Sequence, residues 1–129
     1  MSAWSFKKQF APLILSGTKP TTIRARRKDE RDPEPGDIVK LFTGMRTKEC
    51  QLIGQCKVLA RHVIWVAGLQ RMIQVHAYSG AGVALWRTLD QEEAVALALR
   101  DGFSTVDAFF SFFKVPVRGY LYEFEMVSP

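Results

Sequence analysis

The sequence has few of the side chains that bind metals or carry redox chemistry. It contains two cysteines and two histidines among 129 residues. Five residues separate Cys50 from Cys56, a spacing that matches no zinc or redox motif, and no further cysteine could complete a site. His62 and His76 belong to no metal-ligand or Ser-His-Asp motif, so we interpret them as structural or exposed. We therefore expect two reduced, partly buried thiols, no metal and no cofactor.

Long apolar runs are also absent. No stretch approaches the roughly 20 apolar residues that span a bilayer. Near the N-terminus, Lys7 and Lys8 interrupt what would be the apolar part of a signal peptide. These absences predict a cytoplasmic protein with no membrane partner. The length, with 47% hydrophobic residues, suits one domain over residues 1–129 with a single core.

A glycine-rich phosphate loop is missing as well. The segment SGAG at 79–82 lacks the lysine and the strand–helix setting of such a loop, so it predicts only a turn.

Positive charge is plentiful and unevenly distributed. The formal net charge is +5, which favours a polyanionic partner such as nucleic acid. Six of the eighteen lysines and arginines lie close together, at Lys19, Arg24, Arg26, Arg27, Lys28 and Arg31. Residues 27–34 also contain acidic side chains, which is compatible with a solvated loop or with a loop that contacts phosphates beside a binding site.

The hydrophobic pattern predicts short helices and several strands. A helical stripe favours a helix from about residue 9 or 10 to Ser16, stopped by Gly17. The next segment favours a strand, in which Thr22, Arg24 and Arg26 share one face.

Further strands are expected around residues 37–44, over 50–66 as one or two strands with a bulge near Gly54, and over 119–127. Two helices precede the last strand. Asp90 and Glu93 stand at capping-box spacing before the first of them, and Ser104 is the expected N-cap of the second. This order predicts an α+β protein with a small, mostly antiparallel barrel or curled sheet.

Lys19, Thr22 and Arg24 form the candidate reaction site. A lysine near an arginine and shielded from water has a lowered pKa and can act as a base. A threonine hydroxyl within its reach can act as a nucleophile or donate to an oxyanion, and an arginine can bind an anion or a carbonyl. The spacing alone is common, so a purely structural role is the alternative.

Four segments together resemble the ASCH (ASC-1 homology) domain family of the PUA-like superfamily. They are SFKKQFAPLILSGTKPTTIR, PGDIVKLFTG, ALRDGFSTVDAFFSFF and YLYEFE. The family opens with a helix ending in Ile-Leu-x-Gly-x-Lys and a strand carrying Thr-x-Arg, matched here by Ile14, Leu15, Gly17, Lys19, Thr22 and Arg24. The resemblance covers roughly residues 5–58 and 88–127 and leaves 59–87 unmatched.

The resemblance implies a PUA-like β-barrel with flanking helices and a cleft that binds RNA or nucleotides. One bacterial branch, the YqfB-like proteins, hydrolyses the amide of N4-acetylcytidine with a lysine, a threonine and a glutamate. Lys19 and Thr22 match the first two, and Asp101 stands at the glutamate position. Aspartate is one methylene shorter, and a displacement of about 1 Å can cost about a hundredfold in rate.

Two functions are therefore expected. The first is an RNA- or nucleotide-binding domain, and the second is a small amidohydrolase acting on N4-acetylcytidine or a related nucleoside, or on RNA. Lys19, Thr22 and Asp101 are the expected catalytic residues. Residues expected to hold the ligand, some of them by aromatic stacking, are Phe6, Arg24, Arg26, Trp86 and Ser104. A structural or partner-binding domain is the third possibility.

Overall fold

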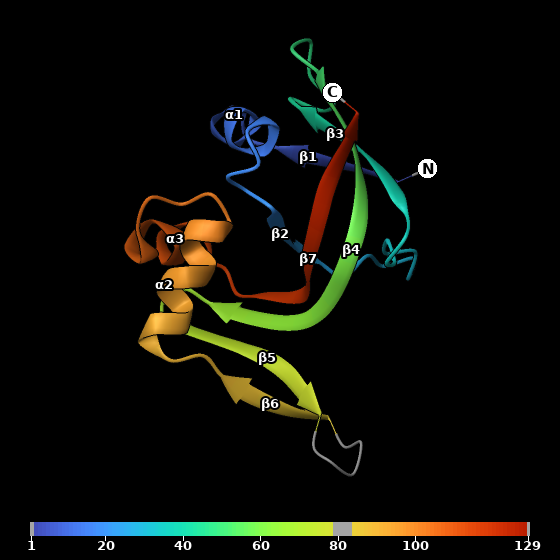
Figure 1. Cartoon of the computed structure of the whole chain (residues 1–129). Helices are drawn as coiled ribbons and strands as arrows, with labels where there is room; N and C mark the ends of the chain where they lie inside the picture. The colour runs from blue at the N-terminus through green and yellow to red at the C-terminus, as the bar shows by residue number, and fades with distance from the viewer. Residues whose placement is uncertain (1, 79–83, 129) are drawn as a thin grey trace.

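The computed structural model describes residues 2–78 and 84–128 of the chain. Strands outnumber helices, and the protein has an α+β fold (Figure 1). In order, the elements are β1 (Ser2–Phe6), the 3-10 helix η1 (Lys8–Phe10), α1 (Ala11–Leu15), β2 (Thr21–Ala25), β3 (Ile38–Thr43), β4 (Gln51–Ala67), β5 (Met72–Tyr78), β6 (Ala84–Thr88), α2 (Gln91–Arg100), α3 (Val106–Phe112) and β7 (Val117–Ser128).

The described strands form one mixed sheet of seven. Its order is β1-β3-β4-β5-β6, and β7 pairs with β4 on one side and β2 on the other. β1 runs parallel to β3, whereas the other pairings between described strands are antiparallel. A barrel would require β1 to pair with β2. Among the described residues these two strands do not pair, so the sheet stays open. The sheet is curled rather than closed because β4 and β7 bend together along their length (Figure 1).

The last strand follows the predicted alternation, and the longest one has the predicted bulge. In β7 the side chains of Tyr120, Tyr122 and Phe124 are buried, as expected for one face of a half-buried strand. The segment 50–66 forms the single strand β4, and its pairing with β3 shifts register beside Gly54. The predicted bulge is therefore confirmed.

The short helices also follow their local signals. Pro12 lies in the first turn of α1, where a missing N–H costs nothing, and Gly17 has a φ of 80° just after the helix ends. Asp90 and Glu93 form the predicted capping box of α2. The predicted helix starts and stops are confirmed at both places.

The N-cap of α3 differs from the prediction. Thr105, not Ser104, has the extended backbone of a cap, and its hydroxyl accepts a hydrogen bond from the Ala108 N–H at 3.0 Å. Ser104 and Thr105 both carry a hydroxyl that can cap a helix. The sequence therefore does not show which of them has the backbone conformation of the N-cap.

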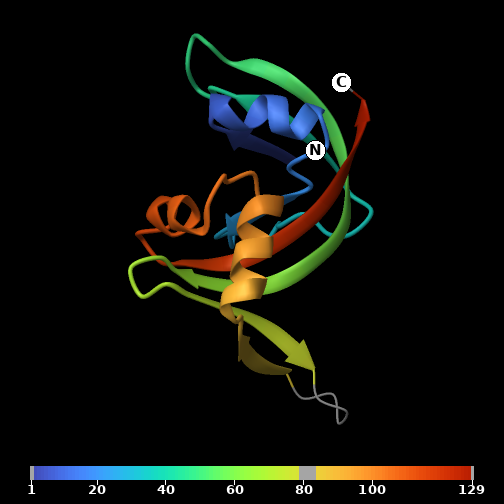
Figure 2. The same cartoon turned by 60° about the vertical axis from the view of Figure 1, so that its left-hand side comes forward.

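The central segment adds a hairpin. β5 and β6 extend the sheet beyond β4 and project away from the helices (Figures 1 and 2). The SGAG segment at 79–82, predicted as a turn, lies outside the described residues. β1 was not predicted, because its alternation is limited to Trp4, Ser5 and Phe6, which is too short a run to indicate a strand.

The core fills the concave side of the bent sheet, where α2 crosses β4 and β7 (Figure 2). Cys56 is fully buried in it, whereas Cys50 is exposed just before β4 begins. The expectation of two partly buried thiols is therefore wrong for both residues. Over the described part of the chain, every helix is too short or too polar to cross a bilayer.

Candidate functional site

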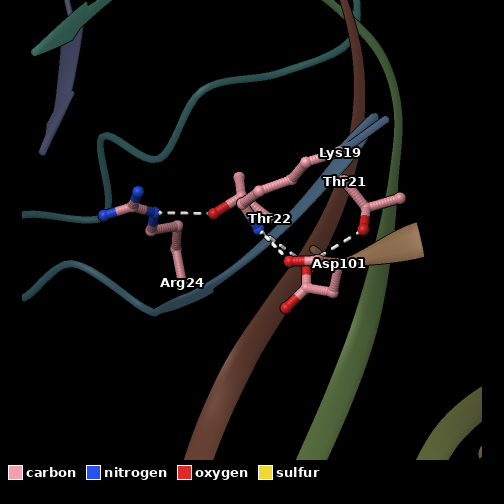
Figure 3. A network of polar contacts seen from close by, with 5 residues as sticks. All are labelled: Lys19, Thr21, Thr22, Arg24 and Asp101. Atoms are coloured by element: carbon pink, nitrogen blue, oxygen red, sulfur yellow. Dashed lines mark hydrogen bonds and ion pairs between the residues drawn. The ribbon is translucent and has the colours of Figure 1, made fainter. Parts of the chain in front are cut away.

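Lys19 and Asp101 form a buried ion pair. Lys19 lies in the turn between α1 and β2, and Asp101 is the C-cap residue that directly follows α2. Lys19 Nζ lies 3.2 Å from Asp101 Oδ1 and donates a hydrogen bond of 2.6 Å to the Asp101 carbonyl oxygen. The Thr21 hydroxyl donates to the same Oδ1 at 2.9 Å, so two β2-side groups converge on one carboxylate oxygen (Figure 3).

Burial governs the protonation of this pair. Loss of hydration lowers the pKa of Lys19, and the charge of Asp101 opposes that shift. Burial likewise raises the pKa of Asp101, against the effect of Lys19 and the Thr21 hydrogen bond. Both shifts favour the neutral forms, so a larger fraction of Lys19 is neutral and able to accept a proton than for a lysine in water.

Thr22 and Arg24 form a second contact at the same site. The Arg24 Nε–H donates to Thr22 Oγ1 at 3.0 Å (Figure 3). The guanidinium carbon of Arg24 lies 4.4 Å from the ring centre of Phe6 and 5.7 Å from that of Trp4, within cation–π range. Burial lowers the pKa of Arg24 to about 10, which still leaves it protonated at neutral pH.

These side chains line one cavity of about 540 Å³. Its wall also contains a group of phenylalanines, which come from β1, η1, α3 and the segments that flank α3. They are Phe6, Phe10, Phe103, Phe112 and Phe113. A mostly apolar wall with a few convergent polar groups is typical of a small-molecule site, and the volume lies in the usual range of about 300–1,000 Å³.

Five of the eight predicted site residues meet at this cavity. Lys19, Thr22, Arg24, Asp101 and Phe6 all line it. The fold brings these side chains together, because the α1–β2 turn and the residue after α2 are in contact, and their roles stay a prediction.

The other three predicted residues do not line the cavity. Arg26 is exposed just after β2 ends, and its guanidinium carbon lies 5.5 Å from the ring centre of Tyr120. Trp86 lies on β6 and packs against His76 at 4.3 Å between ring centres. Ser104 is exposed beside the N-terminus of α3.

Thr21 was missed as a site residue. Strand alternation puts it on the opposite face from Thr22, yet it donates to Asp101. It is the first residue of β2 and follows Pro20, so the alternation of the strand does not decide where its hydroxyl points. Phe10 and Phe112 were also missed as ligand-facing residues. The spacing of Phe10 indicates only a helical core stripe, and no pattern in the sequence singles out Phe112.

Comparison with protein-family models, with curated proteins and with solved structures finds no match to this chain. In the described ranges 2–78 and 84–128, no three or more His, Cys, Asp or Glu side chains gather as metal ligands would.

Proposed function

We propose that this protein binds a nucleobase of RNA or of a nucleotide in the cavity between Lys19 and Phe112. The observation that carries the proposal is the composition of the wall, in which phenylalanine rings surround Lys19, Thr22, Arg24 and Asp101. Aromatic faces stack on bases of any sequence, and each stacked base is worth about 1–3 kcal/mol.

The polar groups of the wall suit the edge of a base. The Arg24 side chain uses only Nε in hydrogen bonds to described residues, so its terminal nitrogens remain available as donors. Asp101 Oδ2 accepts no hydrogen bond from a described residue and can accept one from an amino group. A base that presents a carbonyl beside an amino group, such as cytosine, matches this pair.

We also propose that the protein is a member of the ASCH family and has a PUA-like fold. Its open sheet would then be a variant of the PUA-like barrel. This proposal rests on the resemblance of the opening and closing segments, and on the curled, mostly antiparallel sheet that holds Lys19, Thr22 and Arg24 beside one cavity. The net charge of +5 also favours an anionic partner.

Binding tests the proposal directly. Cytidine, uridine, adenosine and guanosine are titrated into the protein, and affinity is measured by calorimetry together with amide shifts by NMR. Phe112→Ala should weaken binding by about tenfold or more, since its ring is partly exposed and lines the cavity. Leu99→Ala is the matched control, because Leu99 is also partly exposed and lies on α2 outside the cavity wall. Absence of binding by every nucleoside would refute the proposal.

A second candidate is hydrolysis of the acyl amide of N4-acetylcytidine. The observation that favours it is that a lysine of lowered pKa and a threonine line the same cavity. Thr22 Oγ would attack the acetyl carbonyl while neutral Lys19 accepts its proton. The C–N bond would then break, the leaving amino group would take up a proton, and water would release acetate from Thr22.

Arg24 and Asp101 would have supporting roles in that reaction. The Arg24 Nε–H already contacts Thr22 Oγ1 and would stabilise its developing negative charge. Asp101 would return the proton from Lys19 to the leaving amine. Release of cytidine and acetate from N4-acetylcytidine is the assay. Turnover that survives unchanged in Lys19→Met or Thr22→Val would exclude these roles, and no turnover by the wild type would leave only the binding function.

A further inference from the structure

A second cavity, of about 410 Å³, adjoins the first. The two share Ser5, Arg24 and Met45 in their walls. The rest of its wall mixes polar and apolar residues, namely Ala3, Trp4, Ala25, Arg27, Asp32, Pro33, Arg46 and Tyr122. It lies where β1 and the end of β2 face each other without pairing, so it occupies the opening that keeps the sheet from closing.

Three arginines converge on this second cavity. Arg24 forms the partition between the two cavities, and its terminal nitrogens donate to no described residue. Arg27 is fixed at the rim by donating to Ser2 Oγ and to the Ala3 carbonyl oxygen, both at 3.3 Å. Arg24 and Arg27 line the same cavity, and the like charge of Arg27 contributes to lowering the pKa of Arg24.

Arg46 comes from the β3–β4 hairpin. Its backbone has a φ of 66°, in the left-handed region that few residues other than glycine adopt. Arg46 lines the cavity and makes no hydrogen bond or ion pair to a described side chain. Residues held in such conformations concentrate at functional sites.

Two further groups bear on what the cavity can hold. Tyr122 is 1% exposed, and its hydroxyl is the one buried side-chain polar atom of the described residues without a hydrogen-bond partner. Asp32 is the acidic member of the wall, and its Oδ1 accepts a hydrogen bond from the Arg27 backbone N–H at 2.8 Å. Three guanidiniums against one carboxylate leave the cavity with a net positive charge, and Tyr122 lies in the same wall.

We propose that the second cavity is a phosphate subsite, so that the ligand is a phosphorylated nucleotide or an RNA strand rather than a free nucleoside. Arginine forks match the geometry of phosphate oxygens. A base in the first cavity and its phosphate in the second would meet across Arg24, which reaches both. This inference rests on the proposed nucleobase site for the identity of the ligand, but the subsite itself can be tested separately.

The experiment compares cytidine, cytidine 5′-monophosphate, cytidine 3′-monophosphate and inorganic phosphate by calorimetry, with NMR shifts to locate each. A monophosphate should bind about tenfold or more tightly than cytidine, as expected for hydrogen bonds between charged partners. Arg46→Gln should remove most of that preference and leave the affinity for cytidine unchanged. Arg118→Gln is the control, since it removes the same charge from an exposed position outside both cavities.

A variant that is expected to tighten phosphate binding distinguishes a phosphate subsite from a purely structural role of these residues. Asp32→Asn keeps an acceptor for the Arg27 N–H but removes the negative charge, so phosphate binding should tighten. Tyr122→Phe removes only the hydroxyl and should weaken phosphate binding without weakening cytidine binding.

The outcomes distinguish the two proposals. Equal binding of cytidine and both monophosphates, or a preference that survives in Arg46→Gln, would overturn the phosphate subsite and leave the nucleobase site intact. Binding of inorganic phosphate that depends on Arg46, with no binding of cytidine, would support the subsite and refute the nucleobase site. Absence of binding by all four probes would refute both.

Discussion

Lys19 Nζ donates to the carbonyl oxygen of Asp101 at 2.6 Å, across 82 positions of sequence. The contact joins the turn after α1 to the end of α2, and it places a lysine and a carboxylate, each about 3% exposed, at the back of an aromatic cavity. A buried pair of this kind is costly to break, because the remaining charge has no partner. The same pair therefore supports both the fold and the proposed site.

The energetic coupling of Lys19 and Asp101 can be measured with a double-mutant cycle. Lys19→Met should lower the free energy of unfolding by about 3 kcal/mol, because Asp101 then loses its buried counter-charge. Adding Asp101→Asn should recover about 1 kcal/mol or more of this loss. Urea denaturation gives each value. Lys8→Met is the control and should change stability by less than about 0.5 kcal/mol, since its ion pair with Glu49 is exposed. Strict additivity of the two buried substitutions would contradict the coupling.

Gly102 packs closely against the side chains of Lys19 and Phe10. Its φ is 92°, and a Cβ there would lie 2.9 Å from Lys19 Cδ and 3.2 Å from Phe10 Cδ1. Gly17 has a similar φ of 80° but no atom within 4 Å of an added Cβ. Gly102→Ala should therefore cost more stability than Gly17→Ala by about 1 kcal/mol, beyond the 1–2 kcal/mol that the left-handed backbone costs in each. Thermal unfolding of both variants checks this, and equal losses would show that Lys19 and Phe10 move aside freely.

Thr105 caps α3, and its neighbour Ser104 provides a matched comparison. Thr105→Ala should lower the free energy of unfolding by about 1 kcal/mol, because the Ala108 N–H loses its acceptor. Ser104→Ala should change it by less than about 0.5 kcal/mol. Chemical denaturation distinguishes them, and the reverse order of effects would place the cap at Ser104.

The two thiols should differ in reactivity. Burial raises the pKa of Cys56 to about 12, so almost none of it is thiolate at pH 8, whereas Cys50 is exposed. A thiol reagent at pH 8 should modify one cysteine in the native protein and both in denaturant, and mass spectrometry identifies the sites. Cys50→Ser should abolish the native reaction. Rapid labelling of Cys56 in that variant would contradict the buried position.

Glu123 should contribute to the pH dependence of stability. Its hydrogen bonds with Arg100 and His62 lower its pKa below the ordinary value of 4.5. The carboxylate thus stabilises the fold above pH 4.5, and this contribution is lost as the pH falls through the lower folded value. It stays below about 1 kcal/mol because a third of the side chain is exposed. The stability difference between wild type and Glu123→Gln should shrink from pH 6 to pH 3, and a difference that grows would show the opposite shift.

Local signals predicted most of the elements. The capping box at Asp90, the glycine at 102 and the alternation of 119–127 act between residues a few positions apart, and so they can be seen in the sequence. β1 could not be predicted in this way, since its parallel pairing with β3 joins residues about 37 positions apart, as in Ser2 with Val39. The open sheet in place of the expected barrel also depends on long-range pairing, because closure requires β1 and β2 to meet.

The sequence by itself determined which groups are available to the site. Lys19, Thr22 and Arg24 are close in the chain, and a turn followed by a strand brings them near one another whatever the rest of the fold does. The family resemblance pointed to Asp101, but only the tertiary structure brings Asp101 into contact with Lys19 and adds Thr21 to the group. The tertiary structure also decided that phenylalanines from β1, η1 and α3 line the cavity around this group. It likewise decided that Trp86 and Ser104 lie outside the cavity. The physical reason is that side-chain packing and the bend of β4 and β7 set the distances between these side chains. Both depend on contacts between residues far apart in the sequence.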